Sequence, residues 1–201
     1  MKINTAIFLD RDGTINEEVG YLDHPDRLHM IPAAFAAIRL INQSGMKAIV
    51  ISNQSGVARG FFTEENVREI HQNIQQALRE RGAFIDRFYF CPHHPTEGEE
   101  PYRKVCNCRK PQPGMLYQAA DELDIDLARS YMIGDKYADI EAAHRAGVKG
   151  VLVLTGYGRH SSGDKDHETE TQDNRPAVSY THLRAHETPE HLVCRLLLAK
   201  K

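Results

Sequence analysis

Short, nearly continuous apolar runs alternate with stretches of helical periodicity along most of the chain. The runs are rich in β-branched and aromatic residues, which is typical of strands buried on both faces of a parallel sheet. They are TAIFLD (5–10), KAIVIS (47–52), DRFYFC (86–91), SYMIGD (130–135) and KGVLVL (149–154). Strands that alternate with helices in this way predict an α/β domain with a doubly wound parallel sheet.

Start and stop signals predict four helices between these runs. The first begins near Pro32 and ends at Gly45, which can adopt the left-handed conformation. The second begins after Thr63, a good capping residue, and its apolar stripe runs to Gly82. Shorter helices are expected over residues 114–123 and 139–146.

Two segments break this alternation. The segment from Pro92 to Pro113 is long and rich in proline, and cysteines cluster in it and immediately before it. A long loop in a compact domain needs a functional or metal-based reason to be ordered. The segment from Gly156 to Pro176 is polar and acidic without periodicity, so we expect it to be solvated.

Residues 177–201 stand apart from the rest of the chain. Their sequence, AVSYTHLRAHETPEHLVCRLLLAKK, resembles the translation of a transposase-type sequencing adapter that ends in a poly-A tract. A native amphipathic helix is the alternative, because Leu192, Leu196 and Leu197 could share a face. We expect residues 1–176 to form the domain and 177–201 to be non-native. Sequencing the source DNA across codon 177 tests this expectation.

Composition narrows the class of protein. At 201 residues, with 41% hydrophobic and 26% charged residues, the chain suits one globular domain, which we expect to be monomeric. We expect a cytoplasmic protein without membrane contact, because neither an apolar span nor a secretory leader is visible. The net charge of -3, or -5 without residues 177–201, argues against nucleic acid as a partner.

Acidic side chains follow the first and fourth apolar runs. Asp10 and Asp12 are two residues apart in FLDRDGTIN, so both carboxylates can point towards the carboxyl edge of the sheet, where ligands bind. An ordinary Asp-Gly turn at Gly13 is the alternative. Asp135 ends the fourth run, and Asp139 follows. A hard divalent cation, either Mg²⁺ or Mn²⁺, would relieve the repulsion between these carboxylates.

Polar and cationic side chains are predicted at the same edge. Ser52 ends the second run, Asn53 and Gln54 follow it, and Arg109 and Lys110 lie in the long loop. A hydroxyl, a lysine and a divalent cation together can cradle a phosphoryl group, whose oxygens carry the charge of the transition state. This edge is therefore a candidate site of phosphoryl transfer.

The long loop carries paired ligands for a soft metal. Cys91 and His93 form C-x-H, and Cys106 and Cys108 form C-x-C. Four such ligands can complete a tetrahedral Zn²⁺ site that fixes the loop and the cations it carries. His94 is an alternative to His93 as the fourth ligand. Reduced thiols that bind no metal are the alternative to a zinc site. A zinc module that binds nucleic acid would need a more basic chain.

Four motifs, FLDRDGT, ISNQ, RKP and IGDKYADI, resemble in this order those of the haloacid dehalogenase-like phosphatases, over about residues 6–154. The resemblance implies a Rossmann-like fold of the haloacid dehalogenase type. The short segment between Asp10 and Ser52 leaves no room for a large cap domain. By resemblance, Asp10 is the nucleophile that forms an aspartyl-phosphate, and Asp12 is the general acid and base. Asp10, the main-chain carbonyl of Asp12, and Asp135 would hold Mg²⁺, with Asp139 behind them.

The substrate is also implied by resemblance. Ser52 and Lys110 would bind the transferring phosphoryl group. YFCPHHP, CNCRKPQPGML and NQSGVARG resemble the branch of the family that acts on a heptose bisphosphate, a small sugar phosphate. A branch that acts on histidinol phosphate shares the zinc loop and is the alternative. Arg59 and Arg109 favour a bisphosphate, because a second phosphate rewards further cations, although Arg59 could simply be solvated.

Two further expectations complete the sequence-based interpretation. A non-catalytic zinc module would tolerate Asp10→Asn, and a polynucleotide phosphatase would need a basic track. Members of the family continue beyond KGVLVL into another strand and helix, whereas here a polar stretch follows. We therefore expect a missing final element and a stability lower than that of an intact relative by several kcal/mol.

Overall fold

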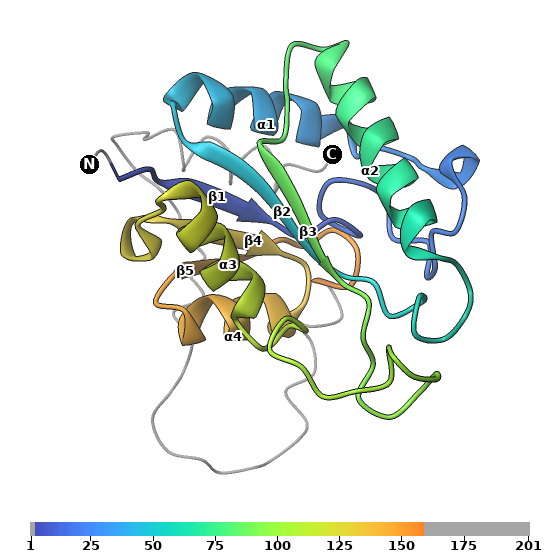
Figure 1. Ribbon diagram of the computed structural model, residues 1–201. Coiled ribbons are helices and arrows are strands. Elements are labelled where there is room, and N and C mark those ends of the chain that lie inside the picture. The colour runs from blue at the N-terminus through green and yellow to red at the C-terminus, as the bar shows by residue number, and fades with distance from the viewer. Residues whose placement is uncertain (1–2, 159–201) are drawn as a thin grey trace.

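The computed structural model describes residues 3–158, and the structural findings concern these residues. Five parallel strands form one sheet in the order β3-β2-β1-β4-β5 (Figure 1). The strands are β1 (Ala6–Leu9), β2 (Lys47–Asn53), β3 (Arg87–Cys91), β4 (Tyr131–Gly134) and β5 (Lys149–Leu152). Each lies in one of the five apolar runs, with β2 extending one residue beyond its run to Asn53, so the predicted doubly wound parallel sheet is confirmed.

Two α-helices cover each face of the sheet (Figure 1). The helices α1 and α2 lie on one face and α3 and α4 on the other, with two short 3-10 helices in the connections. Their bounds are α1 (Pro32–Ser44), α2 (Glu64–Arg79), α3 (Gly114–Leu123), α4 (Tyr137–Arg145), η1 (Pro25–Arg27) and η2 (Leu127–Arg129).

Alternate strand residues supply two separate cores. Leu9 belongs to the core beneath α1 and α2, together with Ile38 of α1 and Ile70 of α2. Its neighbour Phe8 belongs to the core on the other face, together with Leu116 of α3. Because both faces of the strands are covered, alternation of apolar and polar residues is lost. This burial explains the continuous apolar runs of the sequence.

The predicted helix signals operate as expected in α1 and α2. Pro32 stands in the first turn of α1, and Gly45 ends that helix with a φ of 80°. The Thr63 side chain caps α2 by accepting a hydrogen bond from a main-chain N–H of the first turn. The helix ends at Arg79, short of the predicted Gly82, which lies in the following turn with a φ of 70°.

The helix α4 begins earlier than predicted. It starts at Tyr137, whereas the sequence suggested a start at Asp139. The reason is local, because the Asp139 carboxylate turns back and accepts the main-chain N–H of Lys136 at 3.0 Å. Asp139 is thereby fixed in the first turn, beside the carboxyl end of β4.

The segment between Asp10 and Ser52 contains only loop, η1, α1 and β2 within the described residues. It therefore inserts no cap domain there, in agreement with the expectation from its length. None of the helices in residues 3–158 is both long enough and apolar enough to cross a membrane. Residues 177–201, and the expectation of a missing element after KGVLVL, lie outside the described range.

Candidate active site and cysteine cluster

Asp10 directly follows β1 and is almost entirely buried. Its Oδ1 accepts a hydrogen bond from Lys110 Nζ at 2.8 Å, and the same Nζ lies 2.6 Å from Asp139 Oδ1. Burial alone would lower the pKa of Lys110, but the charges of Asp10 and Asp139 raise it above its ordinary value. The long loop thus delivers a charged, 4% exposed lysine onto two carboxylates.

Three buried carboxylates converge at this point. Oxygens of Asp10, Asp135 and Asp139 all lie within 4.8 Å of one another. Burial and the charge of Asp10 raise the pKa of Asp135 to about 7, and burial, opposed by the charge of Lys110, raises that of Asp139 to about 6. Asp135 Oδ2 accepts the Tyr157 N–H at 2.8 Å, whereas the buried Oδ1 has no hydrogen-bond partner among residues 3–158. A buried free oxygen among three carboxylates fits a hard divalent cation.

The Asp12 carboxylate lies apart from this cluster. Arg11 donates to it from Nε at 3.1 Å and from Nη2 at 2.8 Å to each oxygen, and Asn16 and Gln54 donate at 3.0 and 2.8 Å. Burial alone would raise the pKa of Asp12, but the charge of Arg11 and these hydrogen bonds lower it. Gln54 Nε2 also lies 2.6 Å from Ser52 Oγ, which links the acid/base candidate to the hydroxyl.

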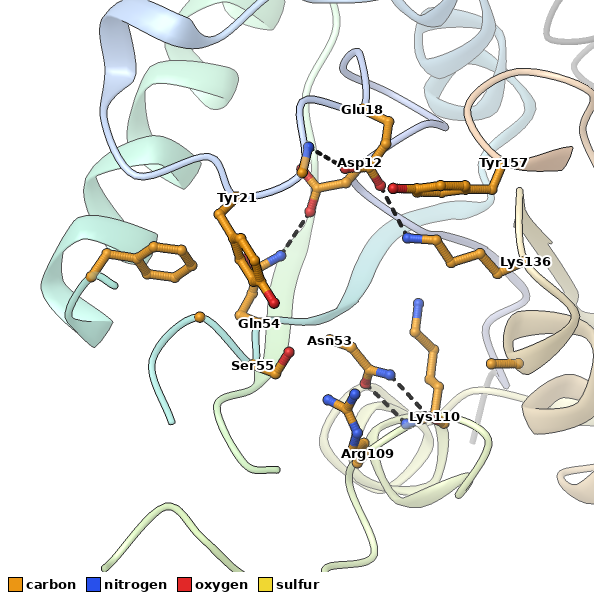
Figure 2. Close-up of a pocket in the computed structure, with 14 residues that line it drawn as sticks. Asp12, Glu18, Tyr21, Asn53, Gln54, Ser55, Arg109, Lys110, Lys136 and Tyr157 are labelled. Atoms are coloured by element: carbon orange, nitrogen blue, oxygen red, sulfur yellow. Dashed lines mark hydrogen bonds and ion pairs between the residues drawn. The ribbon is translucent and has the colours of Figure 1, made fainter. Parts of the chain in front are cut away.

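A cavity of about 390 Å³ lies over the carboxyl ends of the strands (Figure 2). Its wall includes five of the predicted residues, namely Asp12, Asn53, Gln54, Arg109 and Lys110. A smaller adjoining pocket shares part of this wall and adds Asp10, Ser52 and Asp139. The structure therefore gathers the predicted catalytic and substrate-binding residues at one edge of the sheet, with the exception of Arg59.

Arg59 lies at the junction with the long loop instead. It forms an ion pair with Glu97, and its Nη2 lies 3.3 Å from His94 Nε2. It is not among the residues that line either pocket. Arg109, by contrast, lines the cavity while it donates to the main-chain carbonyl of His93 at 3.1 Å.

A reciprocal pair of hydrogen bonds fixes the end of the long loop to the sheet. Asn53 Oδ1 accepts the main-chain N–H of Lys110 at 3.0 Å, and Asn53 Nδ2 donates to the Lys110 carbonyl at 2.9 Å. The Asn53 side-chain amide thus pairs with the Lys110 main chain as a neighbouring strand would. Lys110 can therefore reach Asp10 from a fixed main-chain position.

The cavity wall includes side chains that the sequence did not single out. Lys136 Nζ donates to Glu18 at 3.0 Å and lies 4.7 Å from the centroid of the Tyr157 ring, and Tyr21 faces them across the cavity (Figure 2). Lys136 could have been found as the neighbour of Asp135. Tyr21 and Glu18 carry no comparable signal in a loop of mixed composition.

Only the first three residues of the segment expected to be solvated, 156–158, are described by the structure. Gly156 and Tyr157 are exposed there, although the Tyr157 N–H donates to Asp135 Oδ2 at 2.8 Å. A Cβ at Gly156 would lie 2.2 Å from the same oxygen. The contact of Tyr157 with the site is made by its main chain, which leaves little trace in residue polarity, and the rest of the segment lies outside the described residues.

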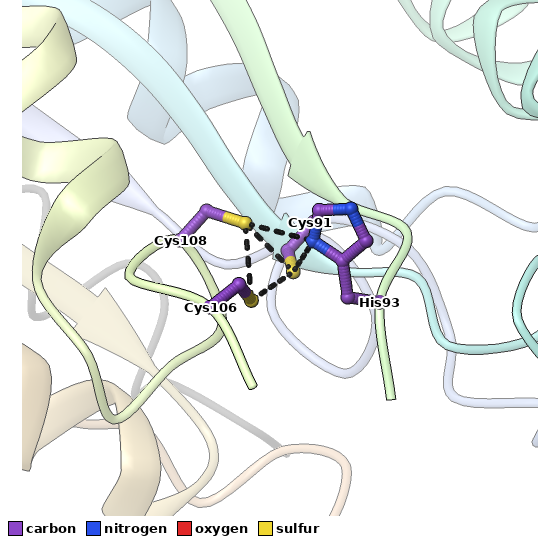
Figure 3. A group of neighbouring side chains, drawn as sticks. All are labelled: Cys91, His93, Cys106 and Cys108. Carbon is purple, nitrogen blue, oxygen red and sulfur yellow. Dashed lines mark hydrogen bonds between the residues drawn. The ribbon is translucent and has the colours of Figure 1, made fainter. Parts of the chain in front are cut away.

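The four predicted zinc ligands converge where the long loop meets the end of β3 (Figure 3). The distances between neighbouring Sγ and Nδ1 atoms run from 3.0 to 3.6 Å among Cys91, His93, Cys106 and Cys108. Sulfurs that share a tetrahedral zinc at about 2.3 Å would be about 3.7 Å apart, so the donor set fits this metal. His94, the alternative ligand, instead accepts the Glu97 N–H through Nδ1 at 3.0 Å.

Comparisons with known proteins agree with this geometry. A family model described as HAD-hydrolase-like matches residues 107–185. The chain is 46% identical to D-glycero-beta-D-manno-heptose-1,7-bisphosphate 7-phosphatase from Yersinia pestis and 47% identical to that from Escherichia coli K12. Each match spans 152 residues, which is 75% of this chain and 81% and 80% of the relatives.

A solved structure extends the likeness over nearly the whole chain. It is the crystal structure of D,D-heptose 1,7-bisphosphate phosphatase from B. bronchiseptica complexed with magnesium and phosphate, with a TM-score of 0.75 and 33% identity over 96% of this chain and 98% of that one. The fold and site thus define a phosphatase of the haloacid dehalogenase-like class, as the motifs predicted. Within that class, the chain belongs to the family of D-glycero-beta-D-manno-heptose-1,7-bisphosphate 7-phosphatases.

Proposed function

We propose that the protein removes the C7 phosphate of D-glycero-D-manno-heptose 1,7-bisphosphate, a step in making activated heptose for bacterial surface polysaccharides. The observation that carries the proposal is the contact of 2.8 Å between Lys110 Nζ and Asp10 Oδ1 in a pocket that also contains Ser52 and Asp12. A nucleophile, a cation for phosphoryl oxygens and an acid/base group are thus within reach of one phosphate. The names of the relatives supply the sugar.

The reaction proceeds in two displacements at phosphorus. A carboxylate oxygen of Asp10 attacks the C7 phosphate, and the bond from phosphorus to the sugar oxygen breaks. Asp12, which is ionised in the free enzyme and has to take up a proton before this step, gives that proton to the sugar oxygen. Water then attacks the aspartyl-phosphate, Asp12 takes a proton from the water, and inorganic phosphate leaves with Asp10 restored. Lys110 and Ser52 hold the phosphoryl oxygens through both steps.

The donor sets support two metals with different roles. Asp10, Asp135 and the main-chain carbonyl of Asp12 would hold Mg²⁺, which when bound supplies charge stabilisation for the phosphoryl oxygens. Asp139 serves by holding Lys110 and the start of α4. Cys91, His93, Cys106 and Cys108 would hold Zn²⁺ as a structural ion that orders the loop.

Arg109 supports the choice of a bisphosphate. Its side chain lines the cavity beside Lys110 but stands outside the cluster that surrounds Asp10. A second planar cation at that position suits the phosphate that does not react. Histidinol phosphate, the alternative from the sequence, has no second phosphate, and the heptose bisphosphate names of the relatives also count against it.

Phosphate release from heptose 1,7-bisphosphate and from histidinol phosphate, each in the presence of Mg²⁺, tests the proposal. We expect kcat/KM to favour the bisphosphate by at least about 100-fold, because one charge-paired phosphate is worth about 3 kcal/mol. Equal rates on the two substrates, or preference for histidinol phosphate, would overturn the assignment of the substrate. Absence of turnover on both by folded, metal-loaded protein would overturn the enzyme class.

A variant sharpens this test at the second phosphate. Arg109→Met should lower kcat/KM for the 1,7-bisphosphate by about 10- to 100-fold through the loss of a charge-assisted contact. Heptose 7-phosphate, which lacks the second phosphate, should be hydrolysed by the variant and by the wild type at similar rates. Equal loss on both substrates would mean that Arg109 serves the reacting phosphate or the loop.

The monomeric state and the cytoplasmic location expected from the sequence stay predictions. Size-exclusion chromatography with light scattering checks the first of them, and a mass near 22.8 kDa is expected.

A further inference from the structure

Arg11 is a buried cation that the proposed reaction leaves unused. Its side chain is 1% exposed, and it lines neither of the two pockets at the site. A buried guanidinium is unfavourable unless a carboxylate compensates it, and the partner of Arg11 is Asp12. Arg11 therefore stands behind the acid/base carboxylate and away from the substrate.

The contacts of Arg11 hold both oxygens of the Asp12 carboxylate. Nη2 contacts both carboxylate oxygens at 2.8 Å, and Nε contacts Oδ1 at 3.1 Å. Gln54 closes the arrangement, because its Nε2 donates to Asp12 Oδ2 at 2.8 Å and its Oε1 accepts from Arg11 Nη2 at 3.2 Å. A carboxylate on one side and a guanidinium on the other leave only this orientation for the Gln54 amide.

The same amide orients the hydroxyl that meets the phosphate. Gln54 Nε2 lies 2.6 Å from Ser52 Oγ, so the hydroxyl oxygen accepts a hydrogen bond from the amide N–H. Its own O–H is then free to be donated to a phosphoryl oxygen. Gln54 is 4% exposed, and both its donor and its acceptor atoms are engaged within the protein.

We infer that Arg11 and Gln54 are positioning residues, which form a buried clamp that holds Asp12 for proton transfer and aims the Ser52 hydroxyl at the phosphoryl group. The inference rests on the proposed function, because it assigns a support to the acid/base group of that mechanism. It also gives Gln54 a different role from the direct contact with substrate that the motif suggested.

The test uses p-nitrophenyl phosphate, whose nitrophenolate leaves with the electron pair of the P–O bond and without a proton. The first displacement then needs Asp10 but not the proton of Asp12, whereas hydrolysis of the aspartyl-phosphate still needs Asp12 to accept the proton of water. In Arg11→Met, we expect a burst of about one nitrophenolate per enzyme, followed by turnover at least about 10-fold slower than in the wild type. Acid quenching and mass spectrometry should then find phosphate on Asp10.

The variant Gln54→Leu is a second, independent test of the clamp. It keeps the volume of the side chain and leaves the pair between Arg11 and Asp12 in place, so it tests the inference even where Arg11→Met fails to fold. We expect a smaller burst in this variant. The exposed Arg39→Met on α1 is the matched control and should show wild-type kinetics.

Two outcomes separate the inference from the proposed function. Folded Arg11→Met and Gln54→Leu enzymes that release nitrophenolate without a burst, with both displacements slowed alike, would overturn the clamp. Wild-type protein that never releases phosphate, and never carries it on Asp10, would instead overturn the proposed function itself.

Discussion

The molecule contains two clusters that fit metal ions, and they are built in opposite ways. The carboxylate cluster stands on regular elements, because Asp10 follows β1, Asp135 follows β4 and Asp139 lies in α4. The thiolate cluster has one ligand, Cys91, at the end of a strand, and the others lie in a loop. The sheet fixes the first cluster, whereas the second cluster has to fix the segment that carries it.

The chemistry of the two clusters follows from this difference. The carboxylates repel one another, and the buried Asp135 Oδ1 has no partner within the described structure. Carboxylate oxygens in such an arrangement are free to bind a cation, which suits a catalytic site. The cysteines and His93 instead face one another and leave no obvious open position, which suits a structural ion. We therefore expect changes in the first cluster to affect turnover and changes in the second to affect stability.

The largest effect is expected from Asp10→Asn. An amide cannot serve as the nucleophile, so kcat should fall by about 10³-fold or more. Zinc content and folding should stay near those of the wild type, because the thiolate cluster is untouched. Assays of phosphate release and metal analysis check both points. Asp26→Asn, at a side chain that is 89% exposed, is the control, and an Asp10→Asn protein with normal activity would favour a non-catalytic zinc module.

Cys108→Ser should separate stability from chemistry. Loss of one thiolate weakens zinc binding, and we expect the free energy of unfolding to fall by about 3 kcal/mol or more. For a chain of this size, Tm should fall by about 6–12 °C, as measured by circular dichroism. Val105→Ser, in the same loop at an 85% exposed side chain, is the matched control. An unchanged Tm would mean that the loop is ordered without zinc.

Gly13→Ala tests how closely the main chain approaches the carboxylates. A Cβ there would lie 2.3 Å from Asp135 Oδ2, and the φ of 79° already disfavours a side chain. Movement of the Asp135 carboxylate to relieve this contact should lower kcat by about 100-fold. Gly45→Ala is the control, since its φ is 80° but nothing lies near its Cβ, and it should lose only about 1 kcal/mol of stability. Similar kinetics for the two variants would argue that Asp135 tolerates movement.

His71 should give the smallest effect, a dependence of stability on pH. This side chain of α2 stacks on Phe88, and burial lowers its pKa from 6.5 to about 3. The folded state therefore keeps His71 neutral while the unfolded chain binds a proton below pH 6.5. Because of His71, the free energy of unfolding has its full value above pH 6.5 and decreases as the pH falls towards 3. At pH 5 the decrease is about 2 kcal/mol.

His71→Phe should remove this dependence. Urea unfolding at pH 7 and pH 5 would show a smaller loss of stability in the variant than in the wild type, by about 2 kcal/mol. Because the other titrating groups are common to both proteins, the difference isolates His71. Equal losses in the two proteins would mean that His71 is protonated in the folded state.

The sequence predicted the parts of the molecule that follow from periodicity and strand ends. The continuous apolar runs indicated strands that are buried on both faces and so predicted the sheet. Because parallel strands end at one edge, side chains at their carboxyl ends, such as Asp10 and Ser52, were expected to lie together there. Arg11 escaped notice because arginine is usually exposed, and only the tertiary structure shows that Asp12 compensates its charge. Tyr157 escaped because its contact is made by the main chain. The ion pair of Arg59 with Glu97 depends on how two loops meet, which no local pattern specifies.

The amide of Asn53 has a consequence for hydrogen exchange. It binds the N–H and the carbonyl of Lys110 at the end of a buried strand, independently of the thiolates. When a chelator removes zinc, the amide hydrogens around Cys106 and Cys108 should exchange quickly with solvent deuterium, while that of Lys110 should remain slow. The boundary between fast and slow exchange would then lie within a few residues. It would separate the loop residues that zinc orders from those that hydrogen bonds to the sheet order.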